Sequence, residues 1–258
     1  MAKIVSIHAF RGGTGKSNLT ANLSAIIAQA GHRVGAIDTD IQSPGIHVLF
    51  GLDEDKVTKA LNDYLWGRCE IQETAYDVSP LLQIGPGRVA VMSGGIFLIP
   101  ASIKAGEITR ILREGYNVGV LNDGFRELIE RMDLDYLFID THPGLNEETL
   151  LSIAISDMLV LILRPDQQDF QGTAVTVEVA RKLGVPRMML VVNKVLPEFD
   201  FAAIRRQVEE TYGIPVAGVL PLSTDMVRLG SHGIFCLHYP EHPLSQGFRE
   251  IAAQIMAE

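Results

Sequence analysis

The feature that most constrains this chain is a strand, a glycine-rich turn and a helix in immediate succession at its start. A short apolar run over residues 4–9 predicts the strand. Apolar residues then recur at helical spacing from Leu19 to Ala30, and Gly31 marks the end of that helix. This order of elements predicts the first βα unit of a parallel sheet.

The same alternation of strand and helix continues along the chain. Further strands are predicted at 33–38, 96–99, 136–140, 158–163, 188–193 and 216–220, with amphipathic helices around 103–113, 122–132, 171–183 and 200–212. We therefore expect an α/β fold, a doubly wound and mostly parallel sheet with helices on both faces, formed as a single domain over 1–258. Between 77 and 95, the triplet Gly85, Pro86 and Gly87 instead predicts a turn between two short strands of an edge hairpin.

The turn at residues 10–17 has the residue types that bind phosphate. Its glycines let backbone N–H groups point inward, and the following helix adds the partial positive charge of its N-terminus. Lys16 is placed to reach β- and γ-phosphate oxygens, and the Ser17 hydroxyl to ligate Mg²⁺. Phe10 occupies the first glycine position of the pattern GxxxxGK[ST], so a glycine-rich turn without function is the alternative. The flanking strand and helix favour a site for a nucleotide and Mg²⁺.

Aspartates follow two of the predicted strands. Asp38 ends the strand at 33–38 and Asp40 follows it by two residues, whereas Asp140 ends the strand at 136–140. The carboxyl ends of parallel strands face the ligand crevice of a doubly wound sheet, where a carboxylate can accept a hydrogen bond from an attacking water. An Asx-rich turn is the better interpretation of residues 38–45 taken alone. Beside a phosphate loop, a catalytic and metal-binding interpretation is favoured.

Together these segments resemble the MinD/ParA family of dimerising ATPases, whose deviant Walker A motif is KGGxGK[ST]. The resemblance covers nearly the whole chain and departs from the pattern at Arg11, where the family has its signature lysine. Arginine keeps the charge and offers a planar donor fork, so we expect Arg11 to act on the partner's nucleotide in trans; an exposed loop arginine is the alternative. The resemblance implies that ATP is bound by Arg11, Gly12, Gly13, Thr14, Gly15, Lys16, Ser17 and Asn18.

The resemblance also implies roles for residues outside the loop. Segments 38–45 and 135–144 resemble switch I and the Walker B and switch II region. Mg²⁺ would be held by Ser17 and, through water, by Asp38, Asp40 and Asp140. Catalysis would rest on Lys16, on Asp40 positioning the attacking water, and on Arg11. Asn193 would read the adenine, or else form a turn at a strand end, and Pro221 would pack against the base. His142 stands where relatives more often have a small residue or proline. We expect it to be an ordinary loop residue without a catalytic role, the alternative being a residue that tunes the switch or contacts a partner.

The activity implied by the resemblance is slow, partner-stimulated hydrolysis of ATP to ADP and phosphate. The protein would form a homodimer when ATP is bound, respond to an unidentified activating protein, and position or partition a cargo such as a chromosome, a plasmid or the division site. The alternatives are a metallocentre-maturation ATPase, a tyrosine autokinase domain and a nucleotide-binding scaffold with little turnover. Iron–sulfur relatives need paired cysteines near switch II, and residues 96–235 contain no cysteine, which weakens the first alternative. Autokinases usually carry a tyrosine-rich tail, whereas the last tyrosine of this chain is Tyr239, which weakens the second.

Charge, cysteine content and hydrophobicity limit the binding partners and the compartment expected for this protein. A net charge of −9 does not support a DNA-binding surface, although a local basic patch is compatible with it. Cys69 and Cys236 are far apart and form no CxxC pair, which fits a reducing cytosol. The first residues predict a strand instead of a secretory leader, and the apolar run at 158–163 is too short for a bilayer, which needs about 20 residues. We expect a cytoplasmic protein whose tail helix packs on the sheet, because Arg249 is the only basic residue that this helix offers a membrane.

Overall fold

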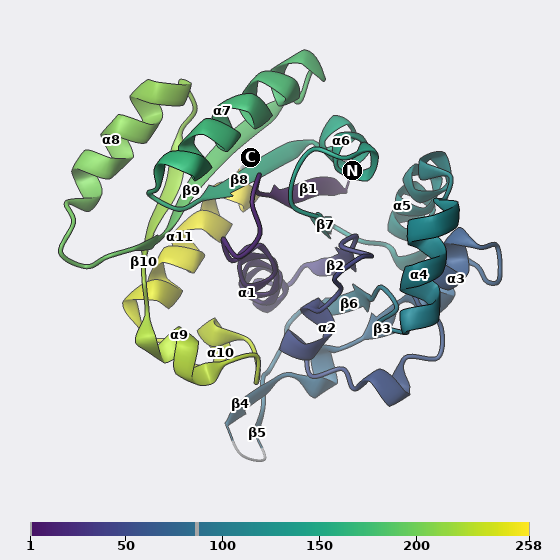
Figure 1. Cartoon of the computed structure of the whole chain (residues 1–258). Helices are drawn as coiled ribbons and strands as arrows, with labels where there is room; N and C mark the ends of the chain where they lie inside the picture. The colour runs from purple at the N-terminus through teal and green to yellow at the C-terminus, as the bar shows by residue number, and fades with distance from the viewer. Residues whose placement is uncertain (1, 86–87, 258) are drawn as a thin grey trace.

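The computed structural model describes residues 2–85 and 88–257, and in this part of the chain eight strands form one sheet in the order β10-β9-β8-β1-β7-β2-β6-β3 (Figure 1). Seven of these strands run parallel, and β3 is antiparallel to β6. The strands are β1 (Lys3–His8), β2 (Arg33–Asp38), β3 (Tyr76–Asp77), β6 (Gly95–Ile99), β7 (Tyr136–Asp140), β8 (Met158–Leu163), β9 (Arg187–Val195) and β10 (Val216–Pro221). The mostly parallel α/β sheet expected from the sequence is confirmed.

Helices cover both faces of this sheet (Figure 1). One face carries α1 (Lys16–Gln29), α2 (Ile46–Leu49), α9 (Thr224–Leu229), α10 (Phe235–His238) and α11 (Pro243–Met256). The other face carries α3 (Leu61–Leu65), α4 (Ala105–Glu114), α5 (Val118–Met132), α6 (Glu147–Ala154), α7 (Gln167–Lys182) and α8 (Phe201–Tyr212). Because successive residues of a strand point to opposite faces, each buried strand supplies both layers of core.

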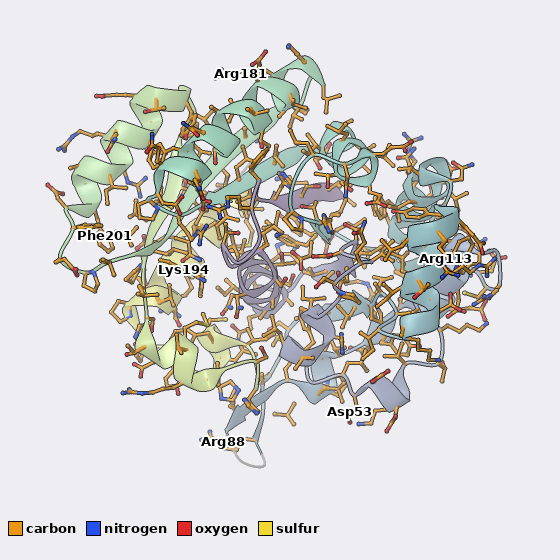
Figure 2. All side chains as sticks on the ribbon, in the orientation of Figure 1. Asp53, Arg88, Arg113, Arg181, Lys194 and Phe201 are labelled. Atoms are coloured by element: carbon orange, nitrogen blue, oxygen red, sulfur yellow. The ribbon has the colours of Figure 1, made fainter. Side chains whose placement is uncertain are left out.

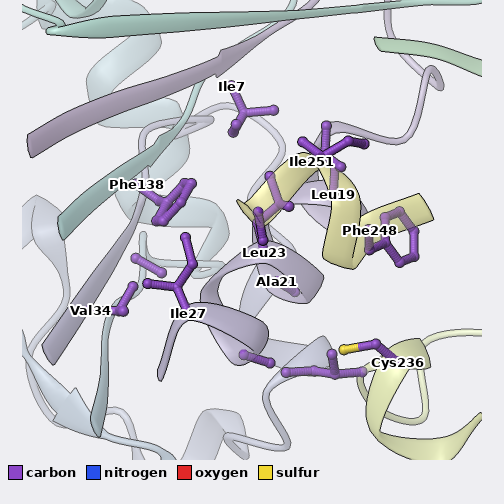
Figure 3. Close-up of a cluster of buried hydrophobic side chains, with 14 of the residues drawn as sticks. Ile7, Leu19, Ala21, Leu23, Ile27, Val34, Phe138, Cys236, Phe248 and Ile251 are labelled. Carbon is purple, nitrogen blue, oxygen red and sulfur yellow. The ribbon is translucent and has the colours of Figure 1, made fainter. Parts of the chain in front are cut away.

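Helix α1 occupies the centre of its layer. Leu23 and Ile27 of α1 lie with Phe138 of β7 and Ile251 of α11 in one buried cluster (Figure 3). Full burial of such side chains is worth about 1.5–3 kcal/mol each, so this cluster fixes the position of α1 under the sheet. The loop that precedes α1 is thereby held at a defined point of the sheet edge.

The hairpin expected between 77 and 95 is present but is not an edge of the main sheet. β4 (Gln83–Gly85) pairs with β5 (Arg88–Val89) as a separate two-stranded sheet, and the predicted turn residues 86–87 lie outside the described residues. Leu82 and Ala90, which flank the hairpin, are buried in the α1 cluster, so the hairpin packs near α10. The edge position is taken by β3, whose two residues are too few to give a period in the sequence.

Helix α11 packs on the sheet as expected, since Phe248, Ile251 and Ile255 are buried. Among the described residues, no helix combines the length and the apolar composition that a bilayer span requires. The carboxyl ends of the central strands β1, β7 and β2 meet at one edge, where Ile7 and Asp38 are both register partners of Asp140. The residues singled out in the sequence gather at this edge.

Candidate functional site

The loop between β1 and α1 has the geometry of an anion site. Gly13 and Gly15 have φ angles of 75° and 104°, in the left-handed region that glycine adopts without strain. Gly15 is the N-cap of α1 and has no side chain to satisfy the first N–H groups of the helix. The loop therefore ends on open backbone donors at the positive end of a helix dipole.

Lys16, the first residue of α1, is buried against carboxylates. Its exposed fraction is 8%. Burial lowers the pKa of Lys16, whereas the negative charges of Asp140, Asp40 and Asp38 act in the opposite direction. A buried ammonium beside three carboxylates is a preorganised charge cluster of the kind found at functional sites.

Asp38 is enclosed by the backbone of the segment that follows β2. The carboxylate accepts hydrogen bonds from the backbone N–H groups of Asp40 at 3.0 Å and Gly45 at 3.1 Å. Burial raises the pKa of Asp38 well above its usual range, and the neighbouring Asp140 carboxylate raises this pKa further. Residues 39–45, which resemble switch I, are thus folded around a single buried carboxyl group.

Asp140, the last residue of β7, lies beside the first turn of α1. Burial raises the pKa of Asp140 to about 6, and a hydrogen bond from the Ser17 hydroxyl acts in the opposite direction. The Thr20 hydroxyl donates to Asp140 Oδ1 at 3.5 Å. The structure therefore brings together Ser17, Asp38 and Asp140, three of the residues expected to hold Mg²⁺.

The oxygen atoms of Ser17, Asp38 and Asp140 fit a Mg²⁺ ion. Hydroxyl and carboxylate oxygens are its preferred ligands, and Mg²⁺ usually keeps several waters and phosphate oxygens as well. Within residues 2–85 and 88–257, no group of three or more His, Cys, Asp or Glu side chains is arranged to hold a metal ion by itself. This donor set is that of an ion completed by nucleotide and water.

Asp40 lies at the mouth of the site and faces a histidine. Its Oδ1 accepts a hydrogen bond from Ser43 N–H at 3.1 Å and lies 3.7 Å from His142 Nε2. Burial raises the pKa of Asp40, while His142 and Lys16 act in the opposite direction. His142, expected to be an ordinary loop residue, thus lies beside Asp40 in the structure.

Arg11 contacts its own chain in this structure. Its guanidinium donates to Gln168 Oε1 and lies 3.7 Å from Asp169 and 3.9 Å from Asp166, all at the start of α7. The preceding Phe10 ring packs on Gly172 of the same helix. The trans action expected for Arg11 remains a prediction, and it requires these contacts to open.

A pocket of about 220 Å³ adjoins the loop. Its lining includes Gly15, Asn18, Asn193, Pro221, Met226 and Phe248. Asn193 Nδ2 donates to the Thr14 carbonyl at 2.8 Å, so one of its amide hydrogens is used within the chain. Asn193 and Pro221 therefore lie together where a base attached to the loop-bound phosphates would be expected.

Two further residues near the loop were not found from the sequence. Lys194, which is labelled in Figure 2, has a φ of 59°. Its Nζ donates to the Gly13 carbonyl at 2.8 Å. His8 is fully buried at the end of β1, where Nδ1 lies 2.8 Å from Thr141 Oγ1 and Nε2 has no partner among the described residues. The signals available in the sequence were weak. They were the Asn193-Lys194 pair after an apolar run and the histidine His8 inside another apolar run.

Comparisons with known proteins find similar sequences over the whole chain. A family model described as "ParA: NUBPL iron-transfer P-loop NTPase" matches residues 1–256. The uncharacterized ATP-binding protein MJ0547 of Methanocaldococcus jannaschii is 27% identical over 257 residues, which cover 99% of this chain and 88% of that protein. The cytosolic Fe-S cluster assembly factor CFD1 of Chaetomium globosum is 34% identical over 169 residues, or 64% of this chain and 48% of the relative.

Solved structures show the same fold. One similar structure is that of the septum site-determining protein MinD from Pyrococcus horikoshii, complexed with Mg-ADP. It superposes with a TM-score of 0.79 at 20% identity, and the superposition covers 99% of this chain and 96% of the MinD chain. MinD from Pyrococcus furiosus gives a TM-score of 0.80 at 20% identity and covers 100% and 99% of the two chains. The overall fold of this chain is therefore shared with solved structures of MinD proteins.

Proposed function

Because this chain belongs to the ParA family of P-loop NTPases, whose members include MinD-type ATPases, we propose that it is an ATP-dependent switch. In this proposal the chain acts as one domain that binds ATP with Mg²⁺, forms a homodimer while ATP is bound, and hydrolyses ATP slowly. The observation that carries the proposal is the buried Lys16 ammonium, which faces Asp38, Asp40 and Asp140 at the open end of a glycine-rich loop.

ATP binding follows from the arrangement of donors around the loop. The backbone N–H groups from Gly12 to Ser17 surround the phosphates, and the Lys16 ammonium neutralises their charge. Asn18, Asn193 and Pro221 line the adjoining cavity and receive the base. When bound, Mg²⁺ supplies charge neutralisation at the phosphate oxygens, with Ser17, Asp38 and Asp140 holding it directly or through water.

Hydrolysis in this scheme is an in-line attack of water on the γ-phosphate. Asp40 accepts a hydrogen bond from the attacking water and so orients it, and Lys16 stabilises the charge that develops on the phosphoryl oxygens. The partly buried position of Asp40 at the mouth of the site is compatible with this role. Arg11 completes the site from the neighbouring subunit after leaving Gln168 and Asp169.

The trans role of Arg11 is tested by single-turnover hydrolysis with Arg11→Ala and Arg11→Lys. We expect Arg11→Ala to be slower by at least about tenfold, with Arg11→Lys in between, because the charge is kept but the planar fork is lost. Dimerisation measured in parallel separates a catalytic effect from a failure to assemble. Wild-type rates in both variants, with dimers intact, would leave Arg11 without a trans role.

For the cargo, we propose the positioning or partitioning class over cluster assembly. The family model carries an iron-transfer description and CFD1 is a relative in sequence, whereas MinD proteins match in fold. Fe–S clusters are held by cysteine thiolates, and this chain offers only Cys69 and Cys236. Burial raises the pKa of Cys236 to about 12, which opposes the thiolate form that a cluster needs. Iron and sulfide bound after anaerobic reconstitution would favour cluster assembly instead.

The switch itself is tested by light scattering after size exclusion, with ATP, ADP or neither. Asp40→Ala should accumulate an ATP dimer, because ATP binds but the water is no longer oriented. The trapped dimer is then sedimented with DNA and with liposomes to find the surface on which it works, and a partner that raises turnover is the activator that we propose. A chain that stays monomeric under every condition would indicate a nucleotide-binding scaffold.

A further inference from the structure

The side chain of Arg11 is held against α7 of its own chain. Its guanidinium, in the loop between β1 and α1, donates a hydrogen bond to Gln168 Oε1 in the first turn of α7. The trans role proposed above needs the same guanidinium in the site of a neighbouring subunit. One guanidinium cannot occupy both positions, so the contact with Gln168 and the trans role exclude each other.

The two carboxylates beside Arg11 are already engaged by other groups. Asp169 is 2% exposed and accepts hydrogen bonds from the Arg164 guanidinium at 2.9 and 3.0 Å, while its Oδ1 lies 3.7 Å from Arg11. Asp166 accepts from the Asp169 N–H at 3.0 Å as the N-cap of α7, and its Oδ1 lies 3.9 Å from Arg11. Both distances to Arg11 are too long for hydrogen bonds. Gln168, which is uncharged and exposed, therefore supplies the hydrogen bond that holds Arg11.

The backbone of the loop is held to α7 by a different residue. The ring of Phe10 packs on Gly172, about one helical turn beyond Gln168. The side chain of Arg11 is 41% exposed, so rotation about its own bonds can carry the guanidinium into solvent. Opening of the contact with Gln168 thus releases the side chain while Phe10 keeps the loop in place.

The size of this effect can be bounded. Exposed contacts between polar and charged side chains shift an equilibrium by about two- to fivefold. In a symmetric dimer both copies of Arg11 must be released, so the factor enters twice. The dimer dissociation constant should therefore be raised by about four- to twenty-five-fold relative to a chain whose Arg11 is free. Such a contact opposes dimerisation but can be overcome by it.

We propose that Gln168 is an autoinhibitory latch that holds Arg11 in its own subunit and so opposes ATP-dependent dimerisation. The proposal rests on the ATPase switch proposed above and deepens it, because it names a contact of the free subunit that must break before the switch assembles. Gln168 contacts no nucleotide in this scheme and acts through Arg11.

The test changes the latch in opposite directions. Gln168→Ala removes the acceptor, whereas Gln168→Glu replaces it with a carboxylate and makes the hydrogen bond stronger. Both are combined with Asp40→Ala, the variant expected to trap the ATP dimer, and the dimer dissociation constant is measured by light scattering with ATP and Mg²⁺. We expect it to fall about fourfold or more with Gln168→Ala and to rise about fourfold or more with Gln168→Glu. ATP affinity, measured in dilute protein, should change by less than about threefold.

Two controls separate the latch from a general effect of charge. Gln167→Glu adds the same charge one residue earlier in α7, and because adjacent residues of a helix do not face each other, it should shift the dimer dissociation constant by less than about twofold. Urea unfolding without nucleotide tests the contact itself. Gln168→Glu should unfold at a higher urea concentration than Gln168→Ala, and this difference should shrink when Arg11→Ala is added to both.

The outcomes distinguish the latch from the switch on which it rests. Unchanged dimerisation in both Gln168 variants, a shift of the same sign in both, or an equal shift in Gln167→Glu would overturn the latch and leave the switch standing. Absence of an ATP-dependent dimer from the wild type and from Asp40→Ala would instead refute the proposed switch, and this inference with it.

Discussion

Asp38 and Asp140 are register partners at the carboxyl ends of the neighbouring parallel strands β2 and β7. Both are buried, with exposed fractions of 1% and 2%. Each carboxyl group therefore loses solvation, and the charge of Asp140 also opposes ionisation of Asp38. The raised pKa values of these two neighbouring carboxyl groups mean that both would ionise more readily if a positive charge were added beside them.

The first prediction concerns the pH dependence of stability without metal or nucleotide. Burial raises the pKa of Asp140 from 3.8 to about 6, so between these values the folded state binds a proton that the unfolded state has lost. The stability contributed by this group is present below pH 4 and is lost as pH rises through 6. Asp140→Asn should thus gain about 2 kcal/mol relative to wild type between pH 4 and pH 7, measured by urea unfolding in EDTA.

Mg²⁺ with ATP supplies the control for this prediction. Added to the wild type at pH 7, the pair should restore stability by binding the ionised site, but it should do little for Asp140→Asn. A stability difference between variant and wild type that does not change with pH would contradict the account.

The second prediction has the opposite sign and concerns His8. Burial lowers the pKa of His8 to about 3, with Lys16 acting in the same direction, so below pH 6.5 the unfolded state binds a proton that the folded state excludes. The Thr141 hydroxyl donates to Ile7 O at 3.0 Å, so it accepts from His8 Nδ1. His8→Asn can keep that donor but cannot be protonated in this range. Between pH 7 and pH 4.5, wild type should lose about 2–3 kcal/mol more unfolding free energy than His8→Asn; equal slopes would be the contrary result.

The third prediction concerns Lys194, whose left-handed backbone is strained in a residue other than glycine. Lys194→Gly relieves that strain but removes the ammonium that bonds to the Gly13 carbonyl. We expect equal or higher thermal stability together with ATP binding weakened about three- to tenfold, because the loop loses a clamp. The matched control is Asp133→Gly at the end of α5. Within the described part of the chain, Asp133 and Lys194 are the two non-glycine residues with a positive φ. The ATP affinity of Asp133→Gly should equal that of wild type, and equal affinity in Lys194→Gly would refute the clamp.

The fourth prediction uses the close approach of Phe10 to Gly172. A Cβ atom at Gly172 would lie 2.2 Å from Phe10 Cδ1, so Gly172→Ala must displace the ring and, with it, the tip of the phosphate loop. We expect a loss of about 1–3 kcal/mol in stability and weaker ATP binding, both largely recovered when Phe10→Ala is added. Gly106→Ala in α4 is the control, since its Cβ would meet nothing within 4 Å and should be neutral or slightly stabilising. A harmless Gly172→Ala would show that the loop tip is not seated on α7.

The sequence predicted the central strands because strands buried on both faces are continuous apolar runs. The predicted bounds of β2, β7 and β8 agree with the structure. It missed the two-residue strand β3 and the short helices α6, α9 and α10, which are too brief for a period to emerge.

Site residues within one segment could be predicted, whereas contacts between segments could not. Gly13, Gly15 and Lys16 act through local backbone geometry that the loop residues themselves determine. The contacts of Arg11 with Gln168 and of Lys194 with Gly13 span 157 and 181 residues, and they depend on sheet order and register. The spacing of apolar residues predicts helices and strands, but it does not specify the order of the strands in the sheet.

The account is tested most directly by titrating ATP into the wild type and into Lys16→Ala by calorimetry, with and without Mg²⁺. Lys16 is buried at the start of α1 beside three carboxylates, and its loss should remove the charge that balances the phosphates. The account predicts binding of ATP to the wild type that requires Mg²⁺, and affinity at least about tenfold weaker in Lys16→Ala. No binding by a folded wild type, or equal affinity in both proteins, would contradict it.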